Sequence, residues 1–365
     1  MKQPDTQTTL RVAVLMVDTF APITILGPLD MLNASCEIWR SVSGDGVRRT
    51  TFQTELISLG KKPLRFGRRV TVYPDASIDT AKTPDLILIP PPGLGDDITA
   101  SLKVSQGFIP WIKACSLRGA RIVSLCTGSF LLAETGLLNG RTATTHWMCA
   151  SLFRKMYPKV DLQPERLIVD EGNIITSSAA MSFQDVMLYL IELYSGREAA
   201  ILTAKTLLVD VGRQAQLPFT SFSAQKIHDD RQILRVQGLM ESESHQRMTM
   251  QYLARSSGMS MRNFDRRFRN ATGESPSSYM QRIRIEKAKR LLETSTHTVD
   301  EIMSKVGYED YRSFHRLFRA FTALSPKAYR LKYGMRAAST SHLLRSAGRS
   351  SKSARKSLST KRDRG

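Results

Sequence analysis

The sequence predicts an α/β domain with a flavodoxin-like, doubly wound and mostly parallel sheet, followed by an all-α domain with two helix–turn–helix units. Three observations support this fold class. Strand-like apolar runs alternate with helix-like segments over the first ~210 residues. A motif in the second half recurs after about 50 residues. The basic charge is concentrated in that second half.

Alternation of strands and helices organises the first half of the chain. Continuous apolar strands between helices are typical of a parallel sheet covered on both faces. We expect strands over 11–17, 52–59, 85–90 and 121–126, and a hairpin over 167–176 around Glu171-Gly172-Asn173. Helices are expected after Pro28 and over 109–117, 182–194 and 197–209.

Changes in this pattern mark the expected domain boundaries. Residues 10–210 form the α/β domain, and 211–230, with Gly212 and Pro218, form a linker. Residues 231–335 form the helical domain. Residues 336–365, rich in Ser, Arg and Lys, are expected to be a disordered basic tail.

The formal net charge of +20 is distributed very unevenly over these parts. Residues 1–215 hold 23 basic and 20 acidic side chains, a net of +3. Residues 216–335 hold 21 and 12, a net of +9, and residues 336–365 hold 9 and 1, a net of +8. A basic module behind a neutral domain favours nucleic acid as a partner, with a merely solvated basic surface as the alternative.

Composition argues against several classes of protein. No apolar run approaches the ~18 residues that span a bilayer, and the N-terminus lacks the features of a signal peptide. No CxxC pair occurs among Cys36, Cys115, Cys126 and Cys149. We therefore expect reduced thiols in a cytoplasmic protein, and no disulfide framework, metal site or cofactor.

The repeat in the basic half has the layout of two helix–turn–helix units. Each copy has a glycine that would end one helix, two phenylalanines four residues apart on the next, and a Ser-Pro that would begin a third. These residues are Gly258, Phe264, Phe268, Ser275-Pro276 and Tyr279, then Gly307, Phe314, Phe318, Ser325-Pro326 and Tyr329. Between the copies, 276–294 is expected to be one long helix that buries Tyr279, Met280, Ile283, Ala288, Leu291 and Leu292.

The polar face of each second helix supplies the expected DNA contacts. Arginine suits guanine and phosphate, and asparagine suits adenine. Arg269 and Arg319 lie on the same faces. The expected contacts are Arg262, Asn263, Arg266 and Arg267 in the first copy, and Arg312, Ser313, His315 and Arg316 in the second. The alternative is a helical bundle whose charged faces are only solvated.

This half resembles the DNA-binding domain of AraC/XylS transcription regulators over about 100 residues. The stretch that carries the resemblance is LARSSGMSMRNFDRRFRNATGESPSSYMQRIRIEKAKRLLETSTHTVDEIMSKVGYEDYRSFHRLFRAFTALSPKAYR. The resemblance implies seven helices, with two recognition helices that enter the major groove about one helical turn apart. Met303 and Ala323 depart from the family, which prefers Ala and Gly at those positions.

Cys126 is the residue of chemical interest in the neutral half. It follows the strand-like run Ile122–Leu125 and precedes Thr127-Gly128, so it is expected at a sharp elbow near a helix N-terminus. That position lowers the pKa of a thiol and suits a nucleophile. An inert, buried cysteine is the alternative interpretation.

The segment SLCTGSFLLAETGLLNGRTATTHW resembles the elbow of class I glutamine-amidotransferase-like proteins of the PfpI type, and the sensor domains of AraC regulators built on that fold. Gly27-Pro28-Leu29-Asp30 matches another family segment. Thr127 stands where the proteases place a histidine, and Thr24 where an acidic residue reaches the thiol. A thiol without base and orienting group is poorly placed for acyl transfer, so we expect a non-catalytic ligand pocket. Its expected members are Gly93, Leu94, Cys126, Thr127, His146, Trp147 and Ser178.

These observations and resemblances together predict a sequence-specific DNA-binding transcription regulator, an activator that responds to an amine or amino-acid-like metabolite. Expected partners are double-stranded DNA, a small-molecule effector, RNA polymerase and a second copy in a homodimer. We expect no association with a membrane. We expect the protein in the cytoplasm, associated with the nucleoid through DNA. The alternatives are a Cys-dependent hydrolase or amidase fused to a DNA-binding domain, and a nucleoid-type protein that binds DNA by charge alone.

Overall fold

A computed structural model describes residues 8–18, 21–42, 50–66, 70–93, 98–211, 228–243 and 248–334. The chain divides into two compact units, Met1–Thr220 and Ser221–Gly365, and each is considered by itself. Most of the expected linker 211–230 and all of the expected tail 336–365 lie outside the described residues. The structure of these two segments therefore stays a prediction.

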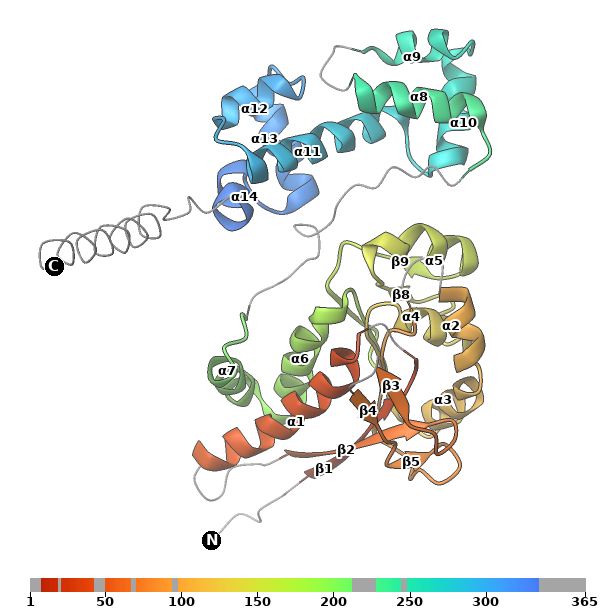
Figure 1. Cartoon of the computed structure of the whole chain (residues 1–365), viewed down its shortest axis with the longest axis vertical. Helices are drawn as coiled ribbons and strands as arrows, with labels where there is room; N and C mark the ends of the chain where they lie inside the picture. The colour runs from red at the N-terminus through yellow and green to blue at the C-terminus, as the bar shows by residue number, and fades with distance from the viewer. Residues whose placement is uncertain are drawn as a thin grey trace, which may run out of the picture. The chain divides into compact units, whose positions relative to one another are not determined.

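A seven-stranded sheet in the order β10-β11-β7-β6-β1-β2-β5 forms the centre of the N-terminal unit (Figure 1). Its strands are parallel except β10, which pairs antiparallel with β11 in the expected hairpin. Two-stranded pairs β3–β4 and β8–β9, which the sequence did not predict, lie outside it. The strands are β1 Thr8–Leu15, β2 Thr50–Ser58, β3 Leu64–Phe66, β4 Val70–Val72, β5 Ala76–Ser77, β6 Leu86–Ile89, β7 Arg121–Ser124, β8 Thr142–Ala143, β9 Asp161–Leu162, β10 Ile168–Asp170 and β11 Ile174–Ser177.

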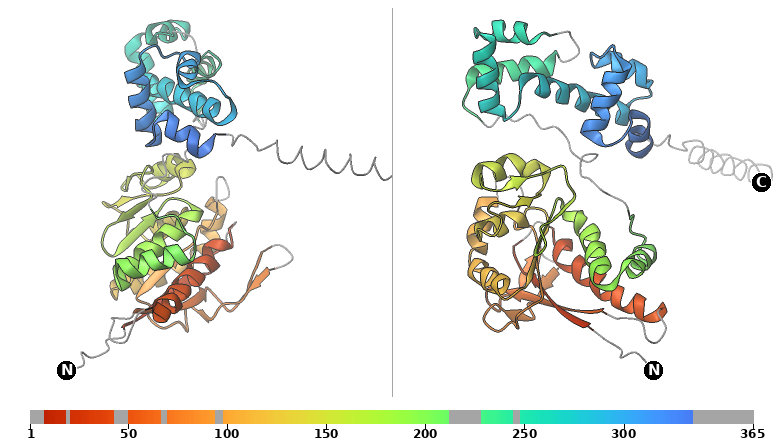
Figure 2. Two further views of the ribbon diagram at one scale, coloured as in Figure 1. Left: turned by 90° about the vertical axis from the view of Figure 1, so that its left-hand side faces the viewer. Right: turned by 180° about the vertical axis from the view of Figure 1, so that it is seen from behind.

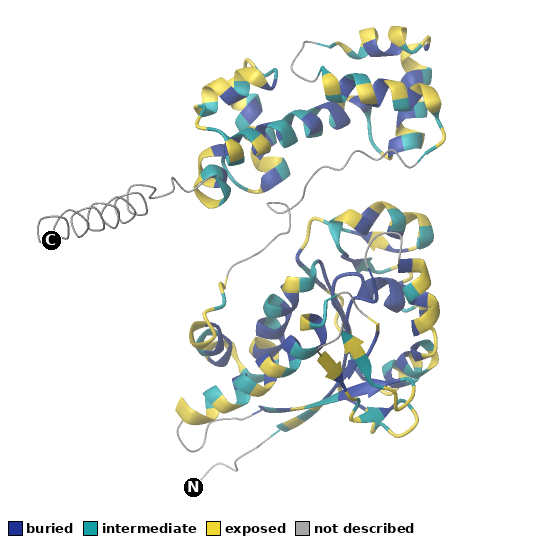
Figure 3. Cartoon of the chain, viewed as in Figure 1, coloured by how far each residue is buried: buried dark blue, intermediate teal, exposed yellow. Residues whose placement is uncertain are grey.

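Helices cover both faces of this sheet, which confirms the doubly wound prediction (Figure 2). On one face lie α1 Ile23–Val42, α6 Phe183–Ser195 and α7 Arg197–Thr206. On the other lie α2 Ile98–Ser105, α3 Phe108–Leu117, α4 Gly128–Glu134 and α5 Ala150–Met156. Alternate residues of a strand enter opposite cores: Val12 and Val14 enter one, and Ala13 and Leu15 the other. The central strands are consequently buried (Figure 3).

The first helix begins earlier than the sequence predicts. We expected a helix after Pro28, but α1 begins at Ile23 and contains Pro28. Proline is disfavoured inside helices because it cannot donate to the preceding turn. The neighbouring Gly27 packs closely against α6, since a Cβ at this position would lie 2.6 Å from the Phe183 ring. Close contact between α1 and α6 therefore explains the glycine of the Gly27-Pro28 segment.

Seven helices make up the described part of the C-terminal unit. They are α8 Arg231–Ser242, α9 Met250–Ser256, α10 Met261–Thr272, α11 Pro276–Thr294, α12 Val299–Lys305, α13 Tyr311–Thr322 and α14 Pro326–Tyr333. The first half of α11 packs in a core with α8, α9 and α10, and its second half packs with α12, α13 and α14. The two predicted helix–turn–helix units are thus α9–α10 and α12–α13, joined by the predicted long helix.

The structural repeat is longer than the sequence motif. Buried residues of α8 recur in α11 at an offset of 52: Ile233, Val236, Gln237 and Met240 correspond to Ile285, Ala288, Lys289 and Leu292. In each half a buried tyrosine donates to a glutamate of the leading helix, Tyr279 to Glu241 at 3.4 Å and Tyr329 to Glu293 at 2.6 Å. Helix α11 therefore ends the first four-helix unit and begins the second. Leu291, expected in the buried stripe, is only half-buried, whereas Ile285 and Lys289 are buried.

The residues that end the two recognition helices allow a matched stability test. Gly273 follows α10 with φ of 78°, and Ala323 follows α13 with φ of 57°. A Cβ is strained in this left-handed region. We expect Gly273→Ala to lower the free energy of unfolding of the C-terminal unit by about 1 kcal/mol, and Ala323→Gly to raise it by about 0.5 kcal/mol because added backbone entropy offsets part of the relief. Urea denaturation measures both, and a destabilising Ala323→Gly would contradict the prediction.

Candidate nucleic-acid interface and elbow site

The recognition helices α10 and α13 are held by equivalent local features. The turn before each contains a glycine with a left-handed backbone, Gly258 at φ 69° and Gly307 at φ 83°. Ser260 and Asp310 cap the helix N-termini by accepting a backbone N–H three residues on. The phenylalanine pairs on the inner face are fully buried in both units. The sequence repeat is thus a repeat of structure.

Both recognition helices expose the same positions. The first, second, sixth, ninth and tenth residues of α10 and of α13 are exposed, and the positions between them are wholly or partly buried. Arginine occupies three of these five positions in each helix. These residues, here called the arginine face, are Arg262, Arg266 and Arg269 on α10 and Arg312, Arg316 and Arg319 on α13.

Four of the eight expected DNA contacts lie on the arginine face: Arg262, Arg266, Arg312 and Arg316. Asn263 and Ser313 are half-buried in the first turns of their helices. Asn263 Oδ1 accepts a hydrogen bond of 3.0 Å from Arg266 Nη2. In this structure Asn263 therefore contacts an arginine of the face.

The structure places Arg267 and His315 differently. The Arg267 guanidinium donates to both carboxylate oxygens of Asp230, at 2.9 and 2.7 Å. His315 stacks on Tyr311 with ring centroids 3.9 Å apart, and burial lowers its pKa. Its Nε2 is buried and has no hydrogen-bond partner among the described residues. Neither side chain is presented on the exposed face.

The eight expected contacts did not include Arg269 and Arg319, which complete the face. Arg269 also pairs with Asp265 at 2.8 Å. The signal was in the sequence, because Arg262, Arg266 and Arg269 are spaced i, i+4 and i+7, which places them on one face of a helix. The equivalent residues of α13 have the same spacing.

The predicted elbow is present in the N-terminal unit. Cys126 follows β7 with φ of 54°, a left-handed conformation that is rare for residues other than glycine. The adjacent Gly128 opens α4, where a Cβ would lie 2.2 Å from the carbonyl oxygen of Ile89. The elbow therefore needs a glycine because it abuts the end of β6.

The Cys126 thiol does not have the lowered pKa that its position near a helix N-terminus suggests. It is fully buried, and this burial raises its pKa to about 12. Hydrogen bonds from the backbone of Thr127 and Ala180 oppose the shift but do not reverse it. The thiol is accordingly protonated at neutral pH, which agrees with the interpretation of an inert buried cysteine.

Most of the expected pocket residues follow the carboxyl ends of strands. Thr127 Oγ1 donates to the carbonyl oxygen of Gly93 at 2.5 Å, which joins the segments after β6 and β7. His146 and Trp147 follow β8 and stack with ring centroids 5.6 Å apart. Ser178 follows β11 and is buried, and its hydroxyl has no hydrogen-bond partner within the described ranges. Leu94 lies outside the described residues.

His146 is poorly suited to act as a base toward Cys126. Its Nδ1 accepts a hydrogen bond of 3.3 Å from the backbone N–H of Met148, so the proton of the neutral ring is on Nε2. Burial also lowers its pKa. In the part of the chain that the structure describes, no hydrogen bond joins this ring to the thiol. Thr24, at the position expected for an acidic residue, is buried and donates to the carbonyl of Ala21.

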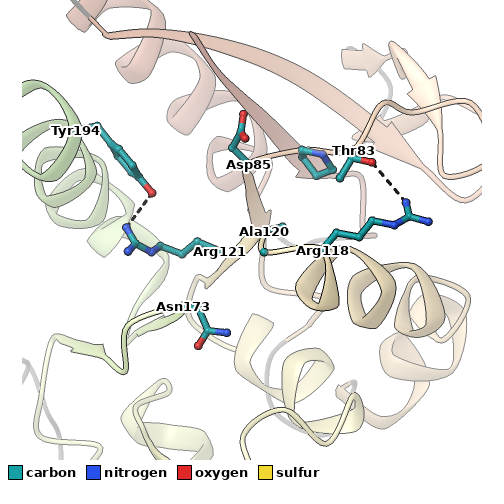
Figure 4. A pocket seen from close by; sticks show the side chains of 9 residues that line it. Thr83, Asp85, Arg118, Ala120, Arg121, Asn173 and Tyr194 are labelled. Carbon is teal, nitrogen blue, oxygen red and sulfur yellow. Dashed lines mark hydrogen bonds between the residues drawn. The ribbon is translucent and has the colours of Figure 1, made fainter. Parts of the chain in front are cut away.

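An open cleft of about 500 Å³, which the sequence did not predict, lies at the opposite, amino edge of the sheet (Figure 4). Arg121 Nη1 donates to the Tyr194 hydroxyl at 2.8 Å, and Arg118 Nη1 approaches Thr83 Oγ1 at 3.5 Å. These arginines thus already have partners. The cleft is lined by Thr83, Pro84, Asp85, Arg118, Gly119, Ala120, Arg121, Asn173 and Tyr194.

Cys126 is expected to resist alkylation in the native protein at pH 8. A thiol with a pKa of about 12 is ionised about a thousandfold less than one at the ordinary value of 9.0. Above pH 9 the unfolded chain loses this proton while the folded chain keeps it, so stability should fall as the pH rises from 9 towards 12. Mass spectrometry after iodoacetamide treatment at pH 8 measures the labelling of Cys126, with the urea-unfolded chain as control. Labelling of Cys126 as fast as in urea would contradict it.

Comparison with known proteins assigns both units. The DJ-1/PfpI family matches residues 10–193, about half of the chain. The chain belongs to the DJ-1/PfpI family. A helix-turn-helix domain family also matches residues 253–332 of this DJ-1/PfpI protein, a range that contains all six residues of the arginine face. These matches confirm the AraC-type and PfpI-type resemblances of the two halves.

Two regulators similar to this DJ-1/PfpI protein align with it over lengths that span both units. The HTH-type transcriptional regulator GbdR of Pseudomonas aeruginosa is 24% identical over 328 residues, which are 89% of this chain and 85% of GbdR. The HTH-type transcriptional regulator CdhR of the same species is 26% identical over 276 residues, 75% of this chain and 80% of CdhR. A crystal structure of an AraC family transcriptional regulator from Pseudomonas putida covers 54% of this chain and 99% of its own, with 16% identity and a TM-score of 0.42.

Two further features are absent from the described residues. No helix there is both long enough and apolar enough to cross a membrane. No group of three or more His, Cys, Asp or Glu side chains there could hold a metal ion.

Proposed function

We propose that this protein is a sequence-specific DNA-binding transcription activator whose DJ-1/PfpI unit binds a small amine or amino-acid-like metabolite. It acts as a homodimer in the cytoplasm, recruits RNA polymerase, and is held at the nucleoid by DNA. The helix-turn-helix match and the regulator relatives support the DNA-binding part. The AraC/XylS resemblance alone supports the activator role, the homodimer and the polymerase contact.

One observation carries the DNA-binding proposal: arginine occupies the same three exposed positions on α10 and α13. A merely solvated surface does not require that the charges recur in register. A guanidinium on the outer face of a recognition helix can donate two hydrogen bonds to guanine or can pair with phosphate. Each helix therefore presents donors where a major groove would receive them.

The effector site we propose is the elbow region at the carboxyl ends of the strands. Ligands of open α/β sheets bind at this edge. The buried Ser178 hydroxyl, which has no partner within the described ranges, leaves a hydrogen bond for a ligand to make. Trp147 is half-buried and offers an aromatic face, which attracts ammonium groups. The aromatic face of Trp147 therefore favours a small ligand with a cationic group, such as an amine.

We propose that this site binds its ligand without turnover. The protonated Cys126 and the orientation of His146 support this. Among the described residues, the strained backbone of Cys126 favours the rival Cys-dependent hydrolase or amidase. Hydrolysis of an ester or amide substrate that disappears in Cys126→Ser would establish the rival.

Two measurements on the full chain test the proposal. Duplexes selected from a random pool should share one sequence, and footprinting should show, for each copy of the chain, two protected segments about one helical turn apart. Equal affinity for all sequences would indicate binding by charge alone. A thermal-shift screen of amines and amino acids should find a ligand that raises the melting temperature. That shift should shrink in Ser178→Ala and persist in Thr83→Ala, a control in the cleft at the opposite edge.

A further inference from the structure

One arginine of the first recognition helix faces the protein. Arg267 Nε and Nη2 donate to the two oxygens of Asp230 at 2.9 and 2.7 Å, and Nη1 donates to Gln232 Oε1. The side chains of Arg267 and Asp230 are 32% and 20% exposed. A two-pronged guanidinium–carboxylate pair of this kind fixes orientation as well as distance. Its hydrogen bonds also hold the pKa of the Asp230 carboxyl below its ordinary value.

The second half of the domain lacks this pair. The position equivalent to Arg267 is Leu317, which packs against the core of that half. The position equivalent to Asp230, 52 residues along, is Arg282, which pairs with Glu274 at 3.3 Å. The pair is therefore not needed to build a helix–turn–helix unit, because the second unit forms around an apolar residue at the same place.

Asp230 lies where the chain enters the domain. It caps α8 by accepting the backbone N–H of Ile233 at 3.2 Å, and it follows residues 212–227, which connect the two units in sequence. His228 has its Nε2 3.0 Å from Gln237 Oε1, and its Nδ1 accepts from the Asp230 backbone N–H at 3.3 Å. We call His228, Asp230 and Arg267 the clasp. It fastens residues 228–230 and the start of α8 to the first recognition helix.

We propose that the clasp positions the first recognition helix, α10, for DNA, whereas the second, α13, is positioned without such a pair. Arg267 is then a positioning residue and does not contact DNA. The ion pair holds α10 in a fixed orientation relative to α8, because Asp230 also caps α8. Because α13 has no equivalent pair among the described residues, its half-site is read independently. This inference rests on the DNA-binding function proposed above.

The test uses the full chain and a duplex that it selects from a random-sequence pool. The bases that each helix contacts are assigned first. Substituting a base in the α10 half-site should no longer change the affinity of Arg266→Ala, and substituting one in the α13 half-site should no longer change the affinity of Arg316→Ala. The variants are Asp230→Asn, which keeps the helix cap, Arg267→Gln, and both together. Arg197→Gln is the matched control because it breaks an exposed ion pair, with Glu192 at 3.4 Å, in the other unit.

We expect Asp230→Asn and Arg267→Gln each to weaken binding about tenfold, and the double variant to be no weaker than either. The loss should be confined to the α10 half-site, and the dependence of affinity on salt should be unchanged. Retained reading of the α13 half-site shows in the same measurement that the variant is folded.

Two results would overturn the clasp. If Arg267 contacts phosphate, Arg267→Gln lowers the salt slope by about one while Asp230→Asn leaves binding unchanged or tightens it. If the pair serves only overall stability, both half-sites weaken equally. A wild-type chain that selects no duplex refutes the proposed function instead, so the two failures are distinguishable.

Discussion

Replacing Phe268 with Ala is expected to lower the free energy of unfolding of the C-terminal unit by about 3–5 kcal/mol. The ring is fully buried, with its centroid 5.2 Å from that of Tyr279 and 5.7 Å from that of Phe264. Its loss leaves a cavity that the surrounding helices cannot fill. Because small domains are stable by only about 5–15 kcal/mol, the variant should be marginally folded and should bind DNA weakly. Urea denaturation measures the change.

The repeat supplies an internal replicate and a control for this prediction. Phe318→Ala should lose a similar amount, since Phe318 is equally buried and its ring centroid is 5.5 Å from that of Tyr329. Leu331 is 90% exposed, so Leu331→Ala should change stability by less than about 0.5 kcal/mol. A loss below 1 kcal/mol in both phenylalanine variants would show that these cores are not packed as described.

Replacing Arg266 or Arg316 with Ala is expected to weaken DNA binding by about 1–3 kcal/mol, roughly fivefold to 150-fold. Both side chains are exposed at the same position of their helices. If the contact is to a guanine, the loss depends on the base at one position of the selected duplex. If it is to phosphate, the loss is the same for every sequence and the salt slope falls by about one. Titrations at two salt concentrations separate these cases.

Arg40→Ala in α1 is the matched control for the arginine variants. Arg40 is exposed and pairs with Glu37 at 2.9 Å in the N-terminal unit. Its removal deletes the same charge from the chain without touching the arginine face, so the affinity for the selected duplex should be unchanged. An equal loss in Arg40→Ala would mean that net charge, and not the face, controls binding.

The sequence by itself predicted the fold class of both units but not every element, since the strand pairs β3–β4 and β8–β9 were missed. Alternating apolar runs predicted the sheet and its two helical layers, because strands buried on both faces must be apolar throughout. The recurrence of glycine, phenylalanine and Ser-Pro predicted both helix–turn–helix units, because each residue type meets a local backbone or packing requirement. The elbow at Cys126 was predicted for the same reason. The start of α1 was missed, because proline by itself favours the first turn of a helix, whereas α1 begins at Ile23 and contains Pro28.

The tertiary structure alone decided the state of the candidate site residues. The helix N-terminus at Cys126 suggested a lowered pKa, but burial by surrounding segments raises it. Arg267 belongs by type to a DNA-binding face, yet it pairs with Asp230, 37 residues earlier. The extension of the repeat to α8 and α11 became visible only when buried positions were compared. Sequence patterns report local periodicity and backbone preference, whereas solvent exclusion and ion pairing depend on surfaces that only folding brings together.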